Sequence, residues 1–288
     1  MADHVWDSFD ASGNILVSVF RENTPTSASI HIDHECEVPD DFVVIGGGGD
    51  NNAGAGAFMF ASYPRDDLGA WRVSTKDHLV SSPHLLSCYA FGMQVHDMTK
   101  DQLLSAIQVT NATGLSAEHP MASAQAPLGS HFLIGGGFRV NMRPGDPGNL
   151  ATASYPEFDQ EWSVKAKDHG MPSEATMTSF AIAITRQLRT ESSGTLNLEV
   201  GFSSAFAGPS DHPVATAILP FGFALTGIGA EVRYNEPGQM LWILRPQKNG
   251  STPTGYGVSA ISKDHAGFPS HDILKAWALG VRAVGPRG

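Results

Sequence analysis

The chain has 288 residues, with 18 basic against 29 acidic side chains and a formal net charge of −11. This acidic balance argues against a nucleic-acid groove or a face for an anionic membrane surface. No apolar run approaches a transmembrane span, and the first residues lack the basic and apolar regions of a signal peptide. We therefore expect a soluble protein, cytoplasmic or exported without a recognisable signal peptide. Cys36 and Cys88 are the only cysteines, so no disulfide framework is expected.

A threefold internal repeat is the strongest pattern in the sequence. The tripeptide Lys-Asp-His occurs three times, and its histidines are 91 and 96 residues apart. The copies are Lys76-Asp77-His78, Lys167-Asp168-His169 and Lys263-Asp264-His265. Such a period indicates one domain, residues 1–288, in which repeats of about 12–100, 101–190 and 191–288 bury their apolar faces against each other.

The other elements of each repeat follow in the same order along the chain. A histidine comes first, and a proline stands eight residues after it; the histidines are His31, His119 and His212. An apolar strand then runs into glycine clusters: three glycines at residues 46–48, three at 135–137, and Gly227-Ile228-Gly229. A second strand ends at Pro64, Pro156 and Pro246, and Trp71, Trp162 and Val258 precede the three lysines. A last apolar strand is expected from Phe91, Phe180 and Trp277.

The composition favours an all-β fold. The chain has 31 glycines and 18 prolines, many of them between short alternating segments, and no long stretch with helical periodicity. Residues 270–278 resemble a helix in isolation, but their counterparts at 82–95 and 173–184 favour a strand. We expect four or five strands in each repeat, or twelve to fifteen in total.

The glycine-rich strand ends and the threefold count resemble those of threefold β-prism proteins related to the vitelline membrane outer layer protein. The similarity is architectural and extends over nearly the whole chain. It implies a β-prism-like domain of three pseudo-symmetric repeats, and it assigns no site residues. A β-trefoil-like arrangement is the alternative.

The glycine clusters superficially resemble a phosphate-binding loop. Such a loop needs a helix directly after it, and Asp50-Asn51-Asn52 follows the first cluster instead. Close approach of backbones near a threefold axis, or a strand bulge, explains the glycines better.

Two interpretations of Lys-Asp-His remain open. In the structural one, Asp accepts amide hydrogen bonds in the following turn, His packs at the strand end and Lys stays solvated. In the functional one, each copy lines one of three carbohydrate pockets, and an aromatic residue stacks on the sugar ring. The candidate ligand-binding residues are then Trp71, Lys76, Asp77, His78, Trp162, Lys167, Asp168, His169, Tyr256, Lys263, Asp264 and His265.

One strand diverges from its counterparts in the other repeats. Its alternating pattern places His31, Asp33, Glu35 and Glu37 on one face. Of these, His31, Asp33 and Glu35 are weak candidates for a divalent ion or for acid–base chemistry. The alternative is an edge strand made polar to prevent association between sheets.

The sequence lacks the zinc-protease, nucleophile-elbow, paired-cysteine and EF-hand motifs. We therefore expect no cofactor and favour a non-catalytic, lectin-like protein with up to three equivalent sites for carbohydrate or another small polar ligand. The alternative is an enzyme acting on a sugar or small molecule, with one active site in a divergent repeat. Ligand stoichiometry separates the two.

Overall fold

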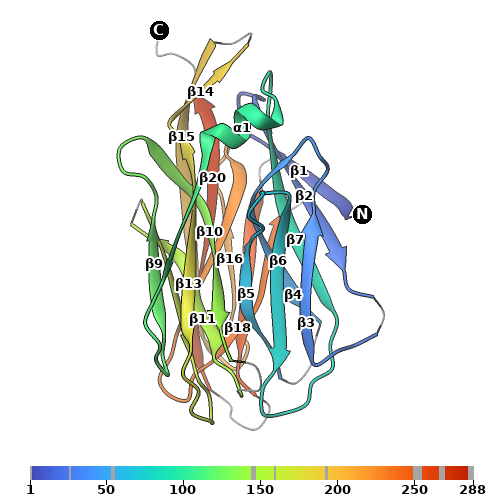
Figure 1. Cartoon of the computed structure of the whole chain (residues 1–288), viewed down its shortest axis with the longest axis vertical. Coiled ribbons are helices and arrows are strands. Elements are labelled where there is room, and N and C mark those ends of the chain that lie inside the picture. The colour runs from blue at the N-terminus through green and yellow to red at the C-terminus, as the bar shows by residue number, and fades with distance from the viewer. Residues whose placement is uncertain are drawn as a thin grey trace.

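The computed structural model describes residues 2–25, 27–52, 56–143, 147–158, 160–191, 194–248, 255–265 and 270–284. This part of the chain forms three antiparallel β-sheets and one short helix, so the all-β prediction is confirmed. The strands run along the length of the molecule and α1 (Lys100–Ala106) lies near one end (Figure 1). None of the described helical segments has the length and apolar character needed to cross a membrane.

Each sheet has six or seven strands. In spatial order, the first sheet is β1 (Asp3–Phe9), β2 (Ile15–Asn23), β7 (Leu86–Val95), β4 (Val43–Asn51), β18 (Met240–Lys248), β19 (Tyr256–Lys263) and β16 (Val214–Ile218). The second is β3 (His31–Glu37), β6 (Ala70–Asp77), β5 (Ala57–Pro64), β10 (His131–Asn141), β13 (Thr176–Thr185) and β8 (Ile107–Thr113). The third is β14 (Gln187–Thr190), β15 (Gly194–Ser210), β20 (Asp272–Val284), β17 (Ala224–Arg233), β11 (Leu150–Glu157), β12 (Glu161–Lys167) and β9 (Met121–Gln125).

Every sheet joins strands from two of the predicted repeats. The junctions are the antiparallel pairs β4–β18, β5–β10 and β11–β17. Their registers correspond, because Ser62 pairs with Phe138, Ser154 with Ala230 and Leu244 with Gly49. No repeat therefore completes a sheet by itself.

The predicted count of twelve to fifteen strands is wrong, because the described residues form twenty. The predicted repeats contain six strands (β2–β7), seven (β8–β14) and six (β15–β20) in place of four or five, and β1 precedes the first repeat. The prediction of a strand at 270–278 and its counterparts is confirmed by β20, β13 and β7. The helix α1 was not predicted, although Thr99 and Gln102 form a capping box at its start.

Glycines permit three strands of different sheets to approach closely. A Cβ atom on Gly135 of β10 would lie 2.7 Å from the Ile45 carbonyl oxygen, and one on Gly227 of β17 would lie 2.9 Å from that of Ile134. A Cβ on Gly46 of β4 would clash with the Thr226 carbonyl oxygen. A register shift adjoins the glycine in all three strands. Both explanations for the glycine clusters, close backbone approach and a bulge, hold in the structure.

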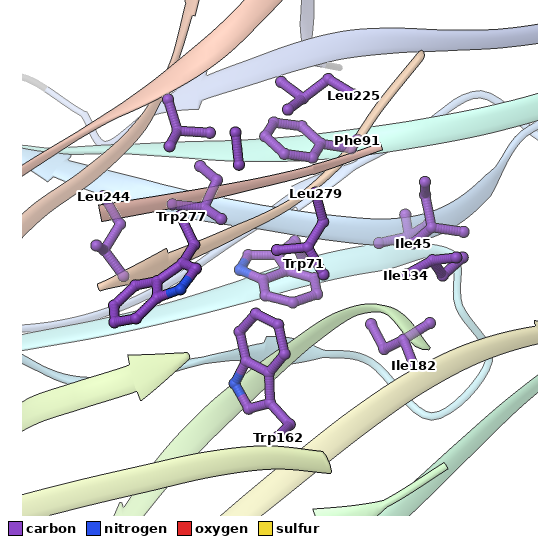
Figure 2. Packing of buried hydrophobic residues seen from close by; sticks show 14 of the residues in the cluster. Ile45, Trp71, Phe91, Ile134, Trp162, Ile182, Leu225, Leu244, Trp277 and Leu279 are labelled. Carbon is purple, nitrogen blue, oxygen red and sulfur yellow. The ribbon is translucent and has the colours of Figure 1, made fainter. Parts of the chain in front are cut away.

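The core around the next glycine shows compensating substitutions. Trp71 and Trp162 are fully buried and lie where a side chain on Gly47 or Gly136 would have to go. Each indole Nε1 donates a 2.9 Å hydrogen bond to a serine, Ser62 or Ser154. Figure 2 shows both indoles within the packed core. The corresponding residues of the third repeat are Val258, Ile228 and Leu244, all buried.

Volume is thus conserved between repeats: a large indole faces glycine and serine, whereas a small valine accompanies isoleucine and leucine. The polar serine is present only where an indole N–H needs an acceptor. These substitutions follow from close packing in the core.

We expect Gly136→Ala to destabilise the fold by about 1–3 kcal/mol, because its methyl group collides with Trp162 and with the Phe180 carbonyl oxygen. In a Trp162→Val background, Gly136→Ala should lower the free energy of unfolding by less. We expect a coupling energy of about 1 kcal/mol between the two substitutions, measured by chemical unfolding. Gly208→Ala is the matched control, because a Cβ there has no neighbour within 4 Å. Additive effects of the two changes would contradict the compensation.

Candidate functional site

The histidines of the three Lys-Asp-His motifs meet at one end of the molecule. The ring centroids of His169 and His265 are 4.6 Å apart, and His78 lies 5.3 Å from His265 and 6.2 Å from His169. All three imidazoles are buried. The strand β6, which precedes His78, ends away from α1 (Figure 1). Residues about ninety positions apart therefore form one histidine cluster, defined as His78, His169 and His265.

His78 joins two repeats through the backbone. Its Nε2 lies 2.6 Å from the His169 carbonyl oxygen and its Nδ1 lies 2.9 Å from that of Pro147. Because carbonyl oxygens only accept, both contacts favour an imidazolium, whereas burial lowers the pKa of His78. The ring packs at the strand end, as the structural interpretation expects.

The three aspartates of the motif have different surroundings. Asp168 Oδ2 accepts a 3.2 Å hydrogen bond from the Ser173 amide, and Asp264 Oδ1 accepts a 2.7 Å bond from the His265 amide. Burial raises the pKa of Asp264, but hydrogen bonds from His169 and His265 outweigh it and hold the value at about 2. Asp77 has no side-chain hydrogen bond within the described ranges. The expected turn contact therefore exists in two copies.

The expectation that the motif's lysines stay solvated is wrong for two of them. Lys167 and Lys263, the last residues of β12 and β19, have 0% exposure. Aromatic rings replace water around the ammonium groups: Lys167 Nζ lies 4.6 Å from the centre of the Tyr234 ring, and Lys263 Nζ lies 4.1 Å from that of Trp242. Burial lowers the pKa of Lys263 to about 8. Lys76 Nζ donates a 2.7 Å bond to the Pro147 carbonyl.

The aromatic candidates lie away from the motifs. Trp71 and Trp162 are core residues with 1% and 0% exposure, so neither offers a ring face at the surface. Tyr256 begins β19 and stacks on Trp6 with ring centroids 5.4 Å apart. Lys263 ends the same strand, roughly 23 Å away at about 3.3 Å per residue. Of the twelve candidates, the structure brings the three histidines together and places Trp71, Trp162 and Tyr256 elsewhere.

The divergent strand β3 is an edge of the second sheet. Arg65 and Arg72 bind Glu35 at 3.3 Å and 3.1 Å, and Arg65 also binds Glu37 at 2.8 Å. His31 Nε2 lies 3.2 Å from an Asp33 oxygen and does not join Glu35 in a ligand-like group among the described residues. The polar-edge interpretation therefore fits β3 better than a metal site.

Aromatic pairs lie across Gly137 and Gly229, the last glycines of the second and third clusters. Gly137 of β10 has no side chain, so Tyr63 and Phe180 from the flanking strands stack over it at 5.2 Å. Tyr155 and Trp277 stack over Gly229 at 5.0 Å in the same way. In the first sheet, Arg245 and Tyr89 flank Gly48. The register aligns Tyr89 with Phe180 and Trp277, so the predicted correspondence with Phe91 is wrong by two residues.

The third sheet carries an aromatic groove that the sequence analysis did not find. The groove has a volume of about 190 Å³ and is lined by Leu133, Pro156, Phe158, Val200, Phe202, Trp277 and Leu279. Phe158 is 85% exposed and Phe202 is 58% exposed, which is unusual for phenylalanine. Phe158 has a φ of 56°, a conformation that costs energy outside glycine. The alternation of Phe202, Ser204 and Phe206 along β15 was the available signal.

Charged side chains lie beside aromatic rings of the third sheet, and we call these side chains the charged rim. Of the rings concerned, Trp277 lines the aromatic groove. Lys275 Nζ lies 4.2 Å from the centre of the Trp277 ring, and Arg233 lies 5.1 Å from that of Phe206. Lys165 lies 5.3 Å from the Tyr155 ring centre and pairs with Glu231 at 3.0 Å. An apolar floor with a charged rim suits a ligand that has both an apolar face and hydrogen-bonding groups.

Comparison with known proteins found no protein-family model and no curated protein that matches this chain.

We expect Asp168→Ala to lower the free energy of unfolding by about 1–3 kcal/mol, because the Ser173 amide loses its acceptor. Asp77→Ala is the matched control from the first repeat and should change it by less than about 0.5 kcal/mol. Chemical denaturation of both variants measures the difference. Equal effects at the two positions would contradict the structural role of Asp168.

Proposed function

We propose that this chain is a non-catalytic, lectin-like protein that binds carbohydrate, built as a β-prism of three pseudo-symmetric repeats. Three observations support the prism: the corresponding junctions between repeats, the mutual approach of β4, β10 and β17, and the meeting of the three motif histidines. Because every sheet needs two repeats, the repeats fold as one unit in this proposal.

The observation that carries the binding proposal is the exposure of Phe158 and Phe202 beside Trp277 in the aromatic groove. A sugar ring has an apolar face of C–H groups, which packs on aromatic carbon, and hydroxyl groups at its edge. In this proposal, Lys275, Arg233 and the Lys165–Glu231 pair are the candidate partners of those hydroxyls. Burying two exposed phenylalanines is favourable in itself, and the charged rim supplies direction and specificity.

Up to three sites follow from the aromatic positions over Gly48, Gly137 and Gly229. They are not equal, since the third sheet adds Phe158 and Phe202, whereas the second sheet offers Tyr63 and Phe180 and the first Tyr89 beside Arg245. The third sheet is the strongest site in this proposal, and the other two are weaker.

We expect Phe158→Ala and Phe202→Ala each to weaken carbohydrate binding at least about tenfold, or ~1.4 kcal/mol, without loss of stability. A glycan array identifies the ligand, and titration calorimetry on the best glycan gives affinity and stoichiometry. The control is Phe221→Ala, which removes another exposed phenylalanine (69%) outside the aromatic groove. The proposal fails if the array finds no ligand, or if all three variants bind equally.

An enzyme with one active site is the second candidate, and one groove favours it. Asp33, His34, Glu35, Tyr63, Arg72 and Ser74 line a hollow of about 240 Å³ on the second sheet, in the divergent repeat. Carboxylates, an imidazole and a tyrosine are the groups that sugar hydrolysis uses. Arg65 binds one carboxylate oxygen of Glu35 and Arg72 binds the other, so salt bridges already engage both oxygens.

We therefore expect no turnover of glycosides by the wild-type chain in a reducing-sugar assay. If turnover occurs, its loss in Glu35→Gln, with Glu37→Gln as the matched control, would assign catalysis to this hollow. A single ligand per chain bound there, and none in the aromatic groove, would favour the enzyme over the binding protein.

A further inference from the structure

Three side chains from two repeats meet at the histidine cluster, and their ligand atoms are arranged as they would be around a metal ion. His169 follows β12, whereas Asp264 and His265 follow β19. His169 Nε2 lies 3.0 Å and His265 Nδ1 lies 3.4 Å from Asp264 Oδ1. The ligand-type atoms of the three residues all lie within 4.8 Å of one another, and all three residues are buried. We call these residues the His169–Asp264–His265 triad.

The spacing suits a small divalent ion. Zinc binds imidazole nitrogen at about 2.0–2.1 Å, so ligands at the corners of a tetrahedron lie roughly 3.4 Å apart. The two distances to Asp264 Oδ1 are close to that separation. Two imidazoles with one carboxylate are a donor set typical of zinc, cobalt and iron, and not of calcium or magnesium, which prefer oxygen ligands.

The second carboxylate oxygen of Asp264 is an independent observation. The Asp264 side chain is 3% exposed, and its Oδ2 has no hydrogen-bond partner within the described part of the chain. A buried carboxylate oxygen without a partner costs free energy, because it has lost its water and gained nothing in exchange. A cation beside this carboxylate would supply the missing interaction, with Oδ2 as a further ligand atom.

The surroundings hold the triad in place. His78 Nε2 donates to the His169 carbonyl oxygen, which fixes the backbone that carries one imidazole. Phe58 packs edge-on against His265, with ring centroids 5.0 Å apart. Outer contacts of this kind orient metal ligands in known sites. The Lys263 ammonium points to the Trp242 ring, so the lysine has an aromatic partner of its own in the same region.

We propose that the His169–Asp264–His265 triad binds one divalent transition-metal ion of the zinc type, through His169 Nε2, His265 Nδ1 and the Asp264 carboxylate. The ion links the second repeat to the third, and it lies apart from the aromatic groove. Its role is structural, since binding only the folded chain stabilises that chain.

The test uses the untagged full-length chain, stripped with a chelator and refolded with zinc chloride so that the buried site can fill. We expect one zinc per chain after dialysis, and a higher melting temperature that the chelator reverses. Cobalt in place of zinc should give visible absorption bands of a low-symmetry site. Asp264→Asn and His265→Gln should abolish binding of both metals.

Matched controls separate this site from adventitious binding. Asp77→Asn changes the same motif position in the first repeat and should keep one zinc per chain. His31→Gln and His271→Gln each remove an exposed histidine–carboxylate pair, and these variants should also keep one zinc per chain. The proposal is overturned if the refolded wild-type chain holds no zinc, or if Asp264→Asn still binds one.

If the variants of the triad do not fold, X-ray absorption on the zinc-loaded wild-type chain decides. Two imidazole ligands with oxygen ligands support the triad. A spectrum with oxygen ligands alone overturns it. Neither result depends on whether the aromatic groove binds carbohydrate.

Discussion

The approach of β4, β10 and β17 is the constraint on which the rest of the structure depends. The carbonyl oxygen of one strand occupies the space that a Cβ atom of the next would need, so glycine is required at Gly46, Gly135 and Gly227. Each of these three strands is also hydrogen-bonded on both edges. One edge pairs with a strand of its own repeat, and the other edge pairs with a strand of a neighbouring repeat. The same contact brings the ends of β6, β12 and β19 together, so that residues distant in the chain form the histidine cluster.

The interior and the outer faces of the sheets differ in how freely their residues change. Inside, the exchange of Trp162, Gly136 and Ser154 for Val258, Ile228 and Leu244 keeps the volume filled and each indole N–H bonded. On the outer faces, the two residues that flank Gly137 are tyrosine and phenylalanine, those that flank Gly229 are tyrosine and tryptophan, and those that flank Gly48 are arginine and tyrosine. Packing limits the first set, whereas the second set differs between the sheets although Tyr155 and Trp277 are only 8% and 7% exposed.

Local patterns predicted much of this fold and little of the candidate site. The all-β class, the strand at 270–278, the polar edge strand β3 and the role of the glycines were all readable from residue type and spacing. The junctions between repeats were not, because pairing of β5 with β10 depends on contacts far apart in sequence. Burial of Lys167 and Lys263 was missed because lysine alone suggests solvent, and the rings of Tyr234 and Trp242 come from another part of the chain. The aromatic groove combines β11, β15 and β20 and has no sequence motif.

The sharing of each sheet between two repeats has a consequence for how such a chain is assembled. A polypeptide with a single repeat would hold two half-sheets, each ending at an edge whose natural partner belongs to another copy. Three such polypeptides could satisfy one another as a trimer, but their faces would be identical by symmetry. Covalent connection holds the three copies at a high effective concentration and removes the need for identity. One face can then acquire Phe158 and Phe202 while the others keep their own residues, which a symmetric trimer cannot do.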